Sequence, residues 1–415
     1  MMSATVLLGI TGGIAAYKTP LLVRLLKKAD RDVHVVMTQA ATQFVTPVTL
    51  STLSQIRVHD DMWRERYQPQ VDHISLADRA DLAVIAPATA NTVGKLAAGI
   101  ADNMLTTVLM AITCPVLICP SMNVNMYRNP IFRDNLETLK KVGYRILEPD
   151  AGWLACGWEG EGRMPDPEII VQEIDRMLGP DDLVGERILV TSGPTEEPLD
   201  PVRFITNLSS GKMGVAVARR AACRGADVTL VAGPMKVDAP RGVKHVTVRT
   251  AQDMHDKVME LAPDMGVVIK AAAVSDFRPS VQSGKKLKKE RIGSSIELVK
   301  TPDILLNLGK NKPTDQILVG FAAETSDVLR NGRKKLKKKN LDMLVLNDVS
   351  RPGAGFNHDT NIVRLLHRSG EEEQMEIMPK EDVADLILDR VRELRRSLTG
   401  PKPGKLRNKR AGKKA

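Results

Sequence analysis

Strand-length apolar runs alternate with amphipathic helical stretches through the first half of the chain. Four such runs can be read, at residues 4–10, Val33–Met37, Leu82–Ala86 and Val116–Cys119. The helical stretch after the first run carries four leucines on one face, Leu21, Leu22, Leu25 and Leu26. Right-handed crossovers between such strands give a parallel sheet with helices on both faces. The pattern therefore predicts a doubly wound, Rossmann-like α/β domain.

The same alternation starts again at Arg187, after a turn-rich segment at Gly179–Asp182. Its expected strands are residues 188–191, Val228–Ala232, Val243–Val248, Val267–Ala271, Ile317–Phe321, Met343–Leu346 and Ile362–Leu366. The two halves share no motif spacing, so we interpret them as different domains rather than as a repeat. We expect one domain at residues 1–180, a second at 181–398, and a basic tail at 399–415 whose composition is typical of disorder.

Small and hydrogen-bonding residues follow the expected strands of the first domain. They lie at Thr11–Gly13, Thr38–Gln39, Pro87–Thr92 and Pro120–Asn123. Doubly wound sheets bind ligands outside the carboxyl ends of their strands. Neutral hydrogen bonds there can hold a phosphate and a planar polar ring, which predicts a nucleotide-like cofactor. Neither domain carries GxGxxG, and this argues against a two-domain nicotinamide oxidoreductase.

Residues 187–224 combine a buried strand, a polar loop and a helix. The helix has an apolar repeat at Met213, Val217 and Ala221. The loop before it contains three polar side chains, Arg203, Asn207 and Lys212. Because the first N–H groups of a helix lack partners and its dipole is positive there, the loop is either an anion site or an ordinary strand-to-helix connection. The number of polar side chains favours the anion site.

Two lysine-rich clusters follow in the second domain. They are Lys285, Lys286, Lys288 and Lys289, and then Arg333, Lys334, Lys335, Lys337, Lys338 and Lys339. Alone, such clusters are commonly solvated surfaces. Together with Asp276 and a glycine-rich turn they favour a polyphosphate ligand, whose charge requires several cations and commonly Mg²⁺.

Residues 151–164 contain four glycines and are predicted to be neither helix nor strand. Such a segment can open and close over a site, with Trp153 and Trp158 supplying contact area. Cys156 on this segment is more accessible than a core thiol and can exchange a proton. His73 precedes the third strand; a histidine there is either structural or a proton carrier at neutral pH.

The overall composition limits the classes of protein to which the chain can belong. Aromatic residues make up 3% of the chain, so aliphatic side chains must fill the cores, as in parallel-sheet proteins. The tail holds seven Lys or Arg of a net charge of +10, which leaves +3 for the body. This balance argues against nucleic acid as a partner. We find no apolar run of the roughly 20 residues that a membrane span needs and expect a cytoplasmic protein.

Several motifs resemble a known bacterial family. SGPTEEPLDPVRFITNLSSGKMG, KAAAVSDF and VGFAAET are similar to the ligase half of bifunctional phosphopantothenoylcysteine decarboxylase/phosphopantothenate-cysteine ligase. GITGGIAAYK, APATANTVGKLAAGIADNML and CPSMNVNMYRNP resemble the homo-oligomeric FMN-containing cysteine decarboxylases. The chain departs from the family at Glu196, where a basic residue is usual, and at Tyr127, where Trp is common.

For the first domain the resemblance implies a flavodoxin-like, FMN-dependent decarboxylase. His73, Asn123 and Cys156 would be catalytic: His73 takes the proton of the substrate thiol, Asn123 orients the carboxylate, and Cys156 delivers a proton as the enethiol is reduced. Oxidation of the thiol to a thioaldehyde would allow carbon dioxide to leave. The implied FMN-binding residues are Gly12, Gly13, Thr38, Pro87, Ala88, Thr89 and Asn91.

For the second domain the resemblance implies a nucleotide-binding ligase, with Asn207 and Lys286 catalytic and Arg203 and Ala273 on the substrate. The implied CTP-binding residues are Asp276, Lys286, Pro302, Asp303, Ile304, Leu305, Phe321, Lys335 and Lys339. CTP would convert the carboxylate into an acyl-cytidylate, with Mg²⁺ on the phosphates, and cysteine would then attack. The residues alone do not decide whether the nucleotide is CTP or ATP, because lysines contact phosphates and not bases.

The implied activity consists of two steps of coenzyme A synthesis. 4′-Phosphopantothenate and cysteine would be ligated, and the product would be decarboxylated to 4′-phosphopantetheine. The resemblance also implies homo-oligomers, with trimers of the decarboxylase domain and dimers of the ligase domain.

Overall fold

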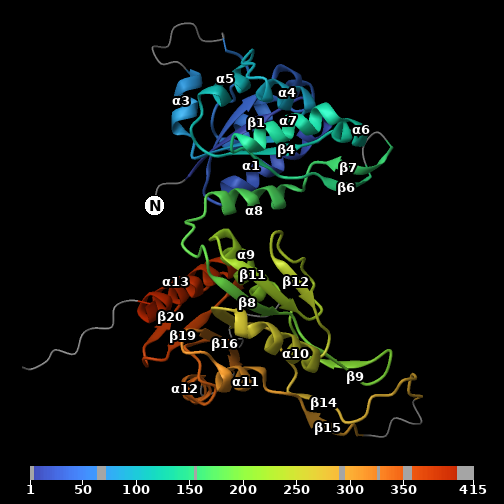
Figure 1. Cartoon of the computed structure of the whole chain (residues 1–415), viewed down its shortest axis with the longest axis vertical. Helices are drawn as coiled ribbons and strands as arrows, with labels where there is room; N and C mark the ends of the chain where they lie inside the picture. The colour runs from blue at the N-terminus through green and yellow to red at the C-terminus, as the bar shows by residue number, and fades with distance from the viewer. Residues whose placement is uncertain are drawn as a thin grey trace, which may run out of the picture. The chain divides into compact units, whose positions relative to one another are not determined.

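The computed structural model describes residues 4–62, 72–153, 157–288, 295–324, 328–348 and 358–399. The chain separates into two compact units, Met1–Gly179 and Pro180–Ala415 (Figure 1). In the described part of the chain, no helix has both the length and the apolar character needed to cross a membrane.

The N-terminal unit is built on a five-stranded parallel sheet of order β2-β1-β3-β4-β5. Its strands are β1 (Thr5–Ile10), β2 (Asp32–Met37), β3 (Leu82–Ala88), β4 (Val116–Pro120) and β5 (Arg145–Ile146). This is the flavodoxin-like order, and the direction of winding reverses between β1 and β3. The predicted doubly wound fold and its four strands are confirmed; β5 was missed because it is only two residues long.

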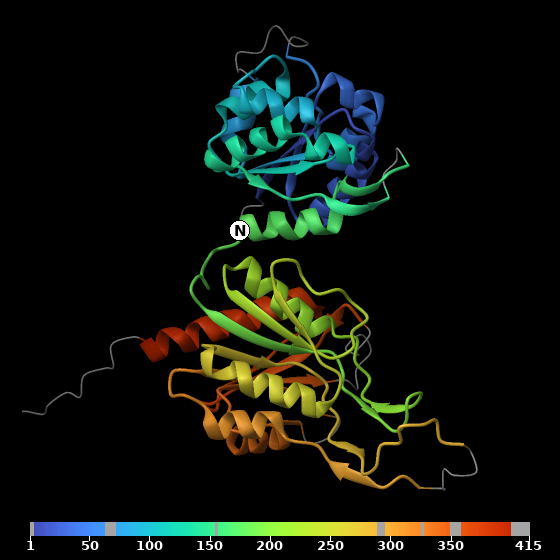
Figure 2. The ribbon, with the colours of Figure 1, turned by 45° about the vertical axis from the view of Figure 1, so that its right-hand side comes forward.

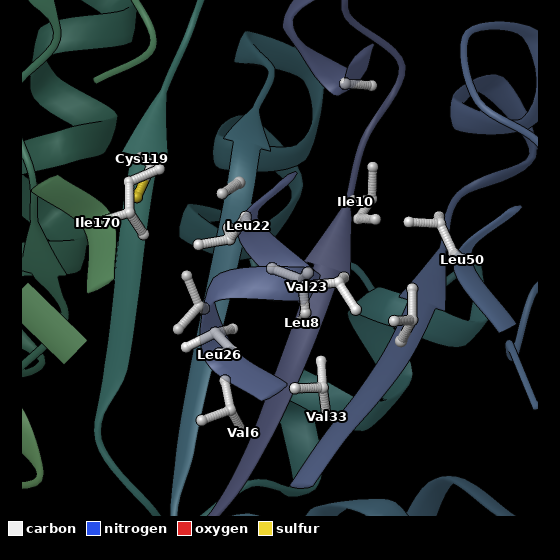
Figure 3. Close-up of a cluster of buried hydrophobic side chains, with 14 of the residues drawn as sticks. Val6, Leu8, Ile10, Leu22, Val23, Leu26, Val33, Leu50, Cys119 and Ile170 are labelled. Carbon is white, nitrogen blue, oxygen red and sulfur yellow. The ribbon is translucent and has the colours of Figure 1, made fainter. Parts of the chain in front are cut away.

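Helices cover both faces of this sheet. They are η1 (Ile14–Lys18), α1 (Thr19–Lys28), η2 (Gln39–Gln43), α2 (Pro47–Ser54), α3 (Asp72–Arg79), α4 (Ala90–Ala97), α5 (Met104–Ala111), α6 (Val124–Arg128), α7 (Pro130–Lys141) and α8 (Pro167–Met177). Leu8 of β1 packs with Leu22 and Leu26 of α1 and Ile170 of α8 in one core (Figure 3). The predicted face of four leucines was partly wrong, because Leu21 is 44% exposed.

The C-terminal unit contains an eight-stranded sheet of order β12-β11-β8-β13-β16-β17-β19-β20. Its strands are β8 (Arg187–Ser192), β11 (Asp227–Ala232), β12 (Lys244–Thr247), β13 (Val267–Lys270), β16 (Ile317–Glu324), β17 (Met343–Asp348), β19 (Val363–His367) and β20 (Glu372–Gln374). The first six are parallel and in the Rossmann order, while β19 and β20 are antiparallel. The seven predicted strands are confirmed, and the reversal lies between β8 and β13.

The helices of this unit divide between the two faces of the sheet (Figure 2). They are α9 (Lys212–Cys223) and α13 (Lys380–Thr399) on one face, and α10 (Ala251–Leu261), η3 (Ala262–Asp264), α11 (Ile304–Asn311) and α12 (Val328–Lys338) on the other. Short strand pairs flank the sheet: β9 (Glu196–Pro198) with β10 (Phe204–Thr206), β14 (Phe277–Pro279) with β15 (Leu298–Lys300), and β18 (Thr360–Asn361) with β21 (Met378–Pro379). The pairs β9–β10 and β14–β15 project as an arm (Figure 1).

Candidate functional sites

The N-terminal unit has a cavity of about 390 Å³ at the carboxyl ends of β1, β3 and β4. Residues that the sequence singled out line it, among them Gly12, Gly13, Thr89, Asn123 and Trp153. The first three come from the loops where the sheet reverses its winding. Such a crevice is where doubly wound proteins bind ligands.

Thr11 joins the two loops that form this crevice. Its hydroxyl donates to the carbonyl oxygen of Pro87 at 2.7 Å and accepts from the backbone N–H of Thr89 at 3.0 Å. Thr11 is fully buried. The sequence predictions missed this residue, although its position directly after an apolar strand was a signal.

Two further features bear on whether these residues suit a flavin mononucleotide. A Cβ atom on Gly12 would lie 2.4 Å from the Cβ of Ala40, so the loop is a close cradle that only glycine permits. The hydroxyl of Thr38 is buried without a hydrogen-bond partner among the described residues. A polar ligand would satisfy that hydroxyl. Pro87 and Ala88 are buried, and neither they, Thr38 nor the exposed Asn91 is among the described residues that line the cavity.

The glycine-rich segment over this cavity was predicted to be neither helix nor strand, and that prediction was wrong. It contains two antiparallel strands, β6 (Asp150–Trp153) and β7 (Glu159–Arg163). Its glycines allow extended positive-φ backbone, with Gly162 at +143°. The backbone N–H of Met122 donates to the carbonyl oxygen of Gly162 at 3.0 Å, which fixes β7 beside Asn123. Trp153 and Trp158 are 73% and 56% exposed.

The remaining predicted decarboxylase residues lie as follows. Asn123 precedes α6, and its Oδ1 accepts from the N–H of Asn125 at 2.8 Å. His73 is half-buried on α3 and is not among the described residues that line the cavity. Cys156 lies outside the described residues.

The C-terminal unit has a cavity of about 530 Å³ at the carboxyl ends of β8, β13, β16 and β17. It brings together residues that are far apart in the sequence. Those that had been singled out as site residues are Asn207, Ala273, Asp276, Leu305, Phe321, Lys335 and Lys339.

The loop that contains Asn207 is fixed to the strands around it. The Nδ2 of Asn207 donates to the carbonyl oxygens of Val274 at 3.1 Å and Ala273 at 3.4 Å. The hydroxyl of Ser192, at the end of β8, donates to the carbonyl oxygen of Gly211 at 2.8 Å. Gly211 has φ +81° and precedes α9, so the N-terminus of that helix opens on the cavity.

The remaining predicted ligase residues do not line the cavity among the described residues. They are Arg203, Lys286, Pro302, Asp303 and Ile304. Asp303 nevertheless pairs with the lining residue Lys339 at 2.9 Å, and its side chain caps α11.

Arg203 and Asp200 hold the exposed segment that carries Lys286. The Nη2 of Arg203 donates to the carbonyl oxygen of Leu287 at 2.9 Å, and the N–H of Leu287 donates to Asp200 at 3.1 Å. The hydrogen bond from Arg203 holds the pKa of Asp200 well below its usual range. Asp200 therefore stays ionised and fixes the residue next to Lys286.

Lys270, at the end of β13, lines the cavity and was not among the predicted site residues. Its ammonium donates to the carbonyl oxygen of Ala272 at 2.9 Å. Burial, together with the positive charge of Lys339, lowers the pKa of Lys270 to about 8. An anion in the cavity would offset both effects.

In the part of the chain that the structure describes, no group of three or more His, Cys, Asp or Glu is arranged to hold a metal ion.

Comparisons with known proteins agree with this two-part organisation. Residues 1–179 match the family model described as Flavoprotein, and residues 183–394 match the model described as DNA/pantothenate metabolism flavoprotein C-terminal domain. The chain is thus a two-domain flavoprotein of the pantothenate-metabolism class.

Similar proteins extend over nearly the whole chain. The coenzyme A biosynthesis bifunctional protein CoaBC of Bacillus subtilis (strain 168) is 46% identical over 390 residues, which are 93% of this chain and 96% of that protein. The CoaBC proteins of Vibrio cholerae serotype O1 and Escherichia coli (strain K12) are 44% and 43% identical, over 94% and 93% of this chain and 98% and 96% of theirs. The chain belongs to the CoaBC family of coenzyme A biosynthesis enzymes, which are bifunctional ligases and decarboxylases. The resemblance seen in the sequence is confirmed.

Proposed function

We propose that the C-terminal cavity binds CTP and 4′-phosphopantothenate and forms an acyl-cytidylate. The observation that carries this is the convergence of Asn207, Asp276, Phe321, Lys335 and Lys339 on one cavity. Lys335 and Lys339 would offset the charge of the triphosphate, and the carboxylate of Asp276 would supply an oxygen ligand of the kind that a phosphate-bound Mg²⁺ prefers. Phe321 gives an apolar surface to the nucleotide.

Asn207 and Lys286 contact the reacting groups in this proposal. A carboxylate is a poor acyl donor, so it must be activated before an amine can attack it. The amide of Asn207 stabilises the mixed anhydride, and Lys286 neutralises charge on the phosphates as pyrophosphate leaves. Arg203 acts on the substrate side, and its hydrogen bond to the carbonyl oxygen of Leu287 holds the residue next to Lys286. Ala273 and residues 302–305 complete the substrate and nucleotide contacts.

In the N-terminal unit we propose that FMN binds along Gly12, Gly13, Thr38 and residues 87–91. The close cradle at Gly12 suits this group, and so does the hydroxyl of Thr38, which has no partner among the described residues. FMN supplies electron transfer with the thiol end of 4′-phosphopantothenoylcysteine.

The protein's own residues then bind the substrate and move protons. Asn123 orients the carboxylate that is lost as carbon dioxide. His73 takes a proton on the thiol side, and Cys156 supplies the proton that is needed when the enethiol intermediate is reduced to 4′-phosphopantetheine.

We further propose trimers of the decarboxylase unit and dimers of the ligase unit. Each unit exposes large apolar side chains, among them Val48 and Ile131 in the first and Val281 and Leu298 in the second. An oligomer also offers a route by which His73, which does not line the described part of its own cavity, could reach the cavity of a neighbour.

One assay tests the whole proposal. The purified chain should be yellow from bound flavin, absorbing near roughly 450 nm. Phosphopantothenate, cysteine and CTP should yield pyrophosphate and carbon dioxide, and ATP should replace CTP poorly. Asn207→Asp should abolish pyrophosphate release yet still decarboxylate added phosphopantothenoylcysteine. Cys156→Ser should still release pyrophosphate but stall at the oxidised enethiol, without forming 4′-phosphopantetheine. A colourless protein that ignores both nucleotides would refute the proposal.

A further inference from the structure

The hydroxyl of Tyr127 has a partner that no step of the proposed function uses. It donates a hydrogen bond to Glu148, which follows β5 in the sequence. Tyr127 is 3% exposed, and its ring packs against Phe132 of α7 with 5.8 Å between the ring centroids. Burial and the hydrogen bond to Glu148 both raise the pKa of Tyr127, so the hydroxyl stays protonated and remains a donor.

One end of this contact is tied to Asn123, which orients the substrate carboxylate in the proposed function. Asn123 caps the N-terminus of α6, and its Oδ1 accepts from the N–H of Asn125 at 2.8 Å. The backbone N–H of Tyr127 donates to the carbonyl oxygen of Asn123 at 3.0 Å. A displacement of Tyr127 would therefore reach Asn123 through a single helical turn.

The other end of the contact is tied to the hairpin of β6 and β7. Glu148 stands two residues before β6, and Trp153, the last residue of β6, lines the cavity of the N-terminal unit. The N–H of Leu147 donates to the carbonyl oxygen of Ile118 at 2.9 Å, which fixes the preceding residue to β4. Glu148 therefore holds the chain where it leaves the sheet and enters the hairpin.

The second strand of the hairpin rests on the same segment as Asn123. A Cβ atom on Gly160 would lie 2.8 Å from the Cγ2 of Val124, the first residue of α6. The N–H of Met122 donates to the carbonyl oxygen of Gly162 at 3.0 Å. Thus β7 contacts this segment directly, and the bond between Tyr127 and Glu148 ties the entry of β6 to it.

Basic side chains also surround Glu148, but they restrain it less than Tyr127 does. The Nζ of Lys140 lies 3.4 Å from Oε1 of Glu148, and the Nη1 of Arg133 lies 3.8 Å from Oε2. The side chain of Glu148 is 51% exposed, and ion pairs at such a surface are weak and leave long side chains mobile. The hydroxyl of Tyr127, in contrast, is held in one place by a buried ring.

We propose that Tyr127 and Glu148 are positioning residues of the decarboxylase, and that their hydrogen bond fixes the hairpin of β6 and β7 relative to Asn123. Neither is among the described residues that line the cavity, so both act through the groups that do. The bond sets the distance between the cavity wall formed by Trp153 and the amide that orients the carboxylate. Small errors in such a distance slow a reaction considerably. The inference rests on the decarboxylase function proposed above.

Tyr127→Phe tests the bond in the full-length enzyme loaded with FMN. The ring and its packing remain, and the exposed Glu148 can turn to water, so the midpoint of thermal unfolding should change little. With added phosphopantothenoylcysteine the kcat of decarboxylation should fall roughly 5- to 10-fold, while the KM changes less than about 2-fold. Pyrophosphate release should be unchanged. Tyr144→Phe, at a partly buried tyrosine packed against the same core, is the matched control.

Variants of Glu148 separate the hydrogen bond from the charge. Glu148→Gln keeps an oxygen that accepts from Tyr127 and should retain most of the activity, whereas Glu148→Ala should resemble Tyr127→Phe. The double variant Tyr127→Phe, Glu148→Ala should be no slower than either single variant, because both changes remove the same bond. Glu137→Ala removes another acidic partner of Lys140, 2.9 Å away, and should be as active as the wild type.

Hydrogen exchange gives a second measurement that does not depend on activity. Without the bond, the backbone amides of β6 should exchange roughly 3- to 10-fold faster in Tyr127→Phe than in the wild type or in Tyr144→Phe. Unchanged exchange in β6, an unchanged kcat, or a Glu148→Gln enzyme as slow as Glu148→Ala would overturn the inference. Absence of carbon dioxide release from the wild type would instead refute the proposed function.

Discussion

The hydroxyl of Thr11 donates a hydrogen bond to the carbonyl oxygen of Pro87 over 2.7 Å. This bond joins the loop after β1 to the end of β3, across the point where the sheet reverses its winding. The hydroxyl oxygen of Thr11 also accepts a hydrogen bond from the backbone N–H of Thr89. One buried side chain thus sets the spacing of the two loops proposed to hold FMN.

Thr11→Val should weaken flavin binding. Valine keeps the shape of the side chain but leaves the carbonyl of Pro87 and the N–H of Thr89 without their partner, at a cost of about 1–3 kcal/mol. We expect the dissociation constant of FMN to rise roughly 10-fold or more, as measured by titration of the apoprotein with flavin fluorescence. Thr11→Ser keeps the hydroxyl and should bind nearly as well as the wild type. Equal affinity of the Val and Ser variants would contradict this role.

Gly162→Ala should impair decarboxylation selectively. A Cβ at this position would lie 2.2 Å from the carbonyl oxygen of Met122, so β7 must move away from the loop that carries Asn123. Carbon dioxide release should fall at least roughly 10-fold, whereas pyrophosphate release should be unchanged.

Gly143→Ala is a control for backbone strain in that experiment. Gly143 also has positive φ, at +92°, but nothing lies within 4 Å of a Cβ there. Both variants should lose a little stability, since a side chain is strained at positive φ. Similar decarboxylation rates in the two variants would show that strain, and not the contact with Met122, limits the activity.

Asp200→Asn should slow ligation without affecting the flavin domain. The change weakens the ion pair between Asp200 and Arg203. It also weakens the hydrogen bonds that fix Leu287, the residue next to Lys286. We expect pyrophosphate release to fall roughly 10-fold, with carbon dioxide release from added phosphopantothenoylcysteine unchanged. Asp238→Asn, at an exposed position, should match the wild type in both assays. An unaffected Asp200 variant would separate this ion pair from catalysis.

The large parallel sheets could be predicted from the sequence because their strands are buried on both faces. Such strands appear as continuous apolar runs, as at Val267–Lys270 and Met343–Asp348. The hairpin strands β6, β7, β14 and β15 lack this signal, since they are short and largely exposed. β7 was not predicted as a strand because its alternating Glu and Gly residues give no apolar run. The glycines nevertheless permit its extended backbone.

The candidate sites were only partly predictable for a related reason. Asn207, Lys270 and Lys339 stand in recognisable motifs, but Lys380 and Asn361 have nothing unusual in their local sequence. Both are buried beside the same cavity, which tertiary packing alone creates. Leu21 was predicted to lie on the apolar face of its helix, but it is exposed. Successive residues of a helix are rotated by about 100°, so the neighbour of a buried leucine can face solvent.

Lys270 should take up a proton when a nucleoside triphosphate binds. In the free protein the pKa of Lys270 is about 8, below its ordinary value of 10.5, so the amine is partly neutral near pH 8.5. Triphosphate charge in the cavity favours the ammonium form and raises that pKa again. Calorimetric titration with CTP at pH 8.5, in buffers of different ionisation enthalpy, should reveal uptake of a fraction of a proton.

The same shift gives the unfolding free energy a defined pH dependence. Between pH 8 and 10.5 the unfolded chain binds more protons at Lys270 than the folded chain does, so this residue makes stability rise with pH in that window. Lys270→Met should remove both this rise and the buffer-dependent binding heat, whereas Lys334→Met on the exposed part of α12 should remove neither. Binding heats that are independent of buffer in the wild type would mean that Lys270 stays protonated throughout. The effect of burial on its pKa would then be offset already in the free protein.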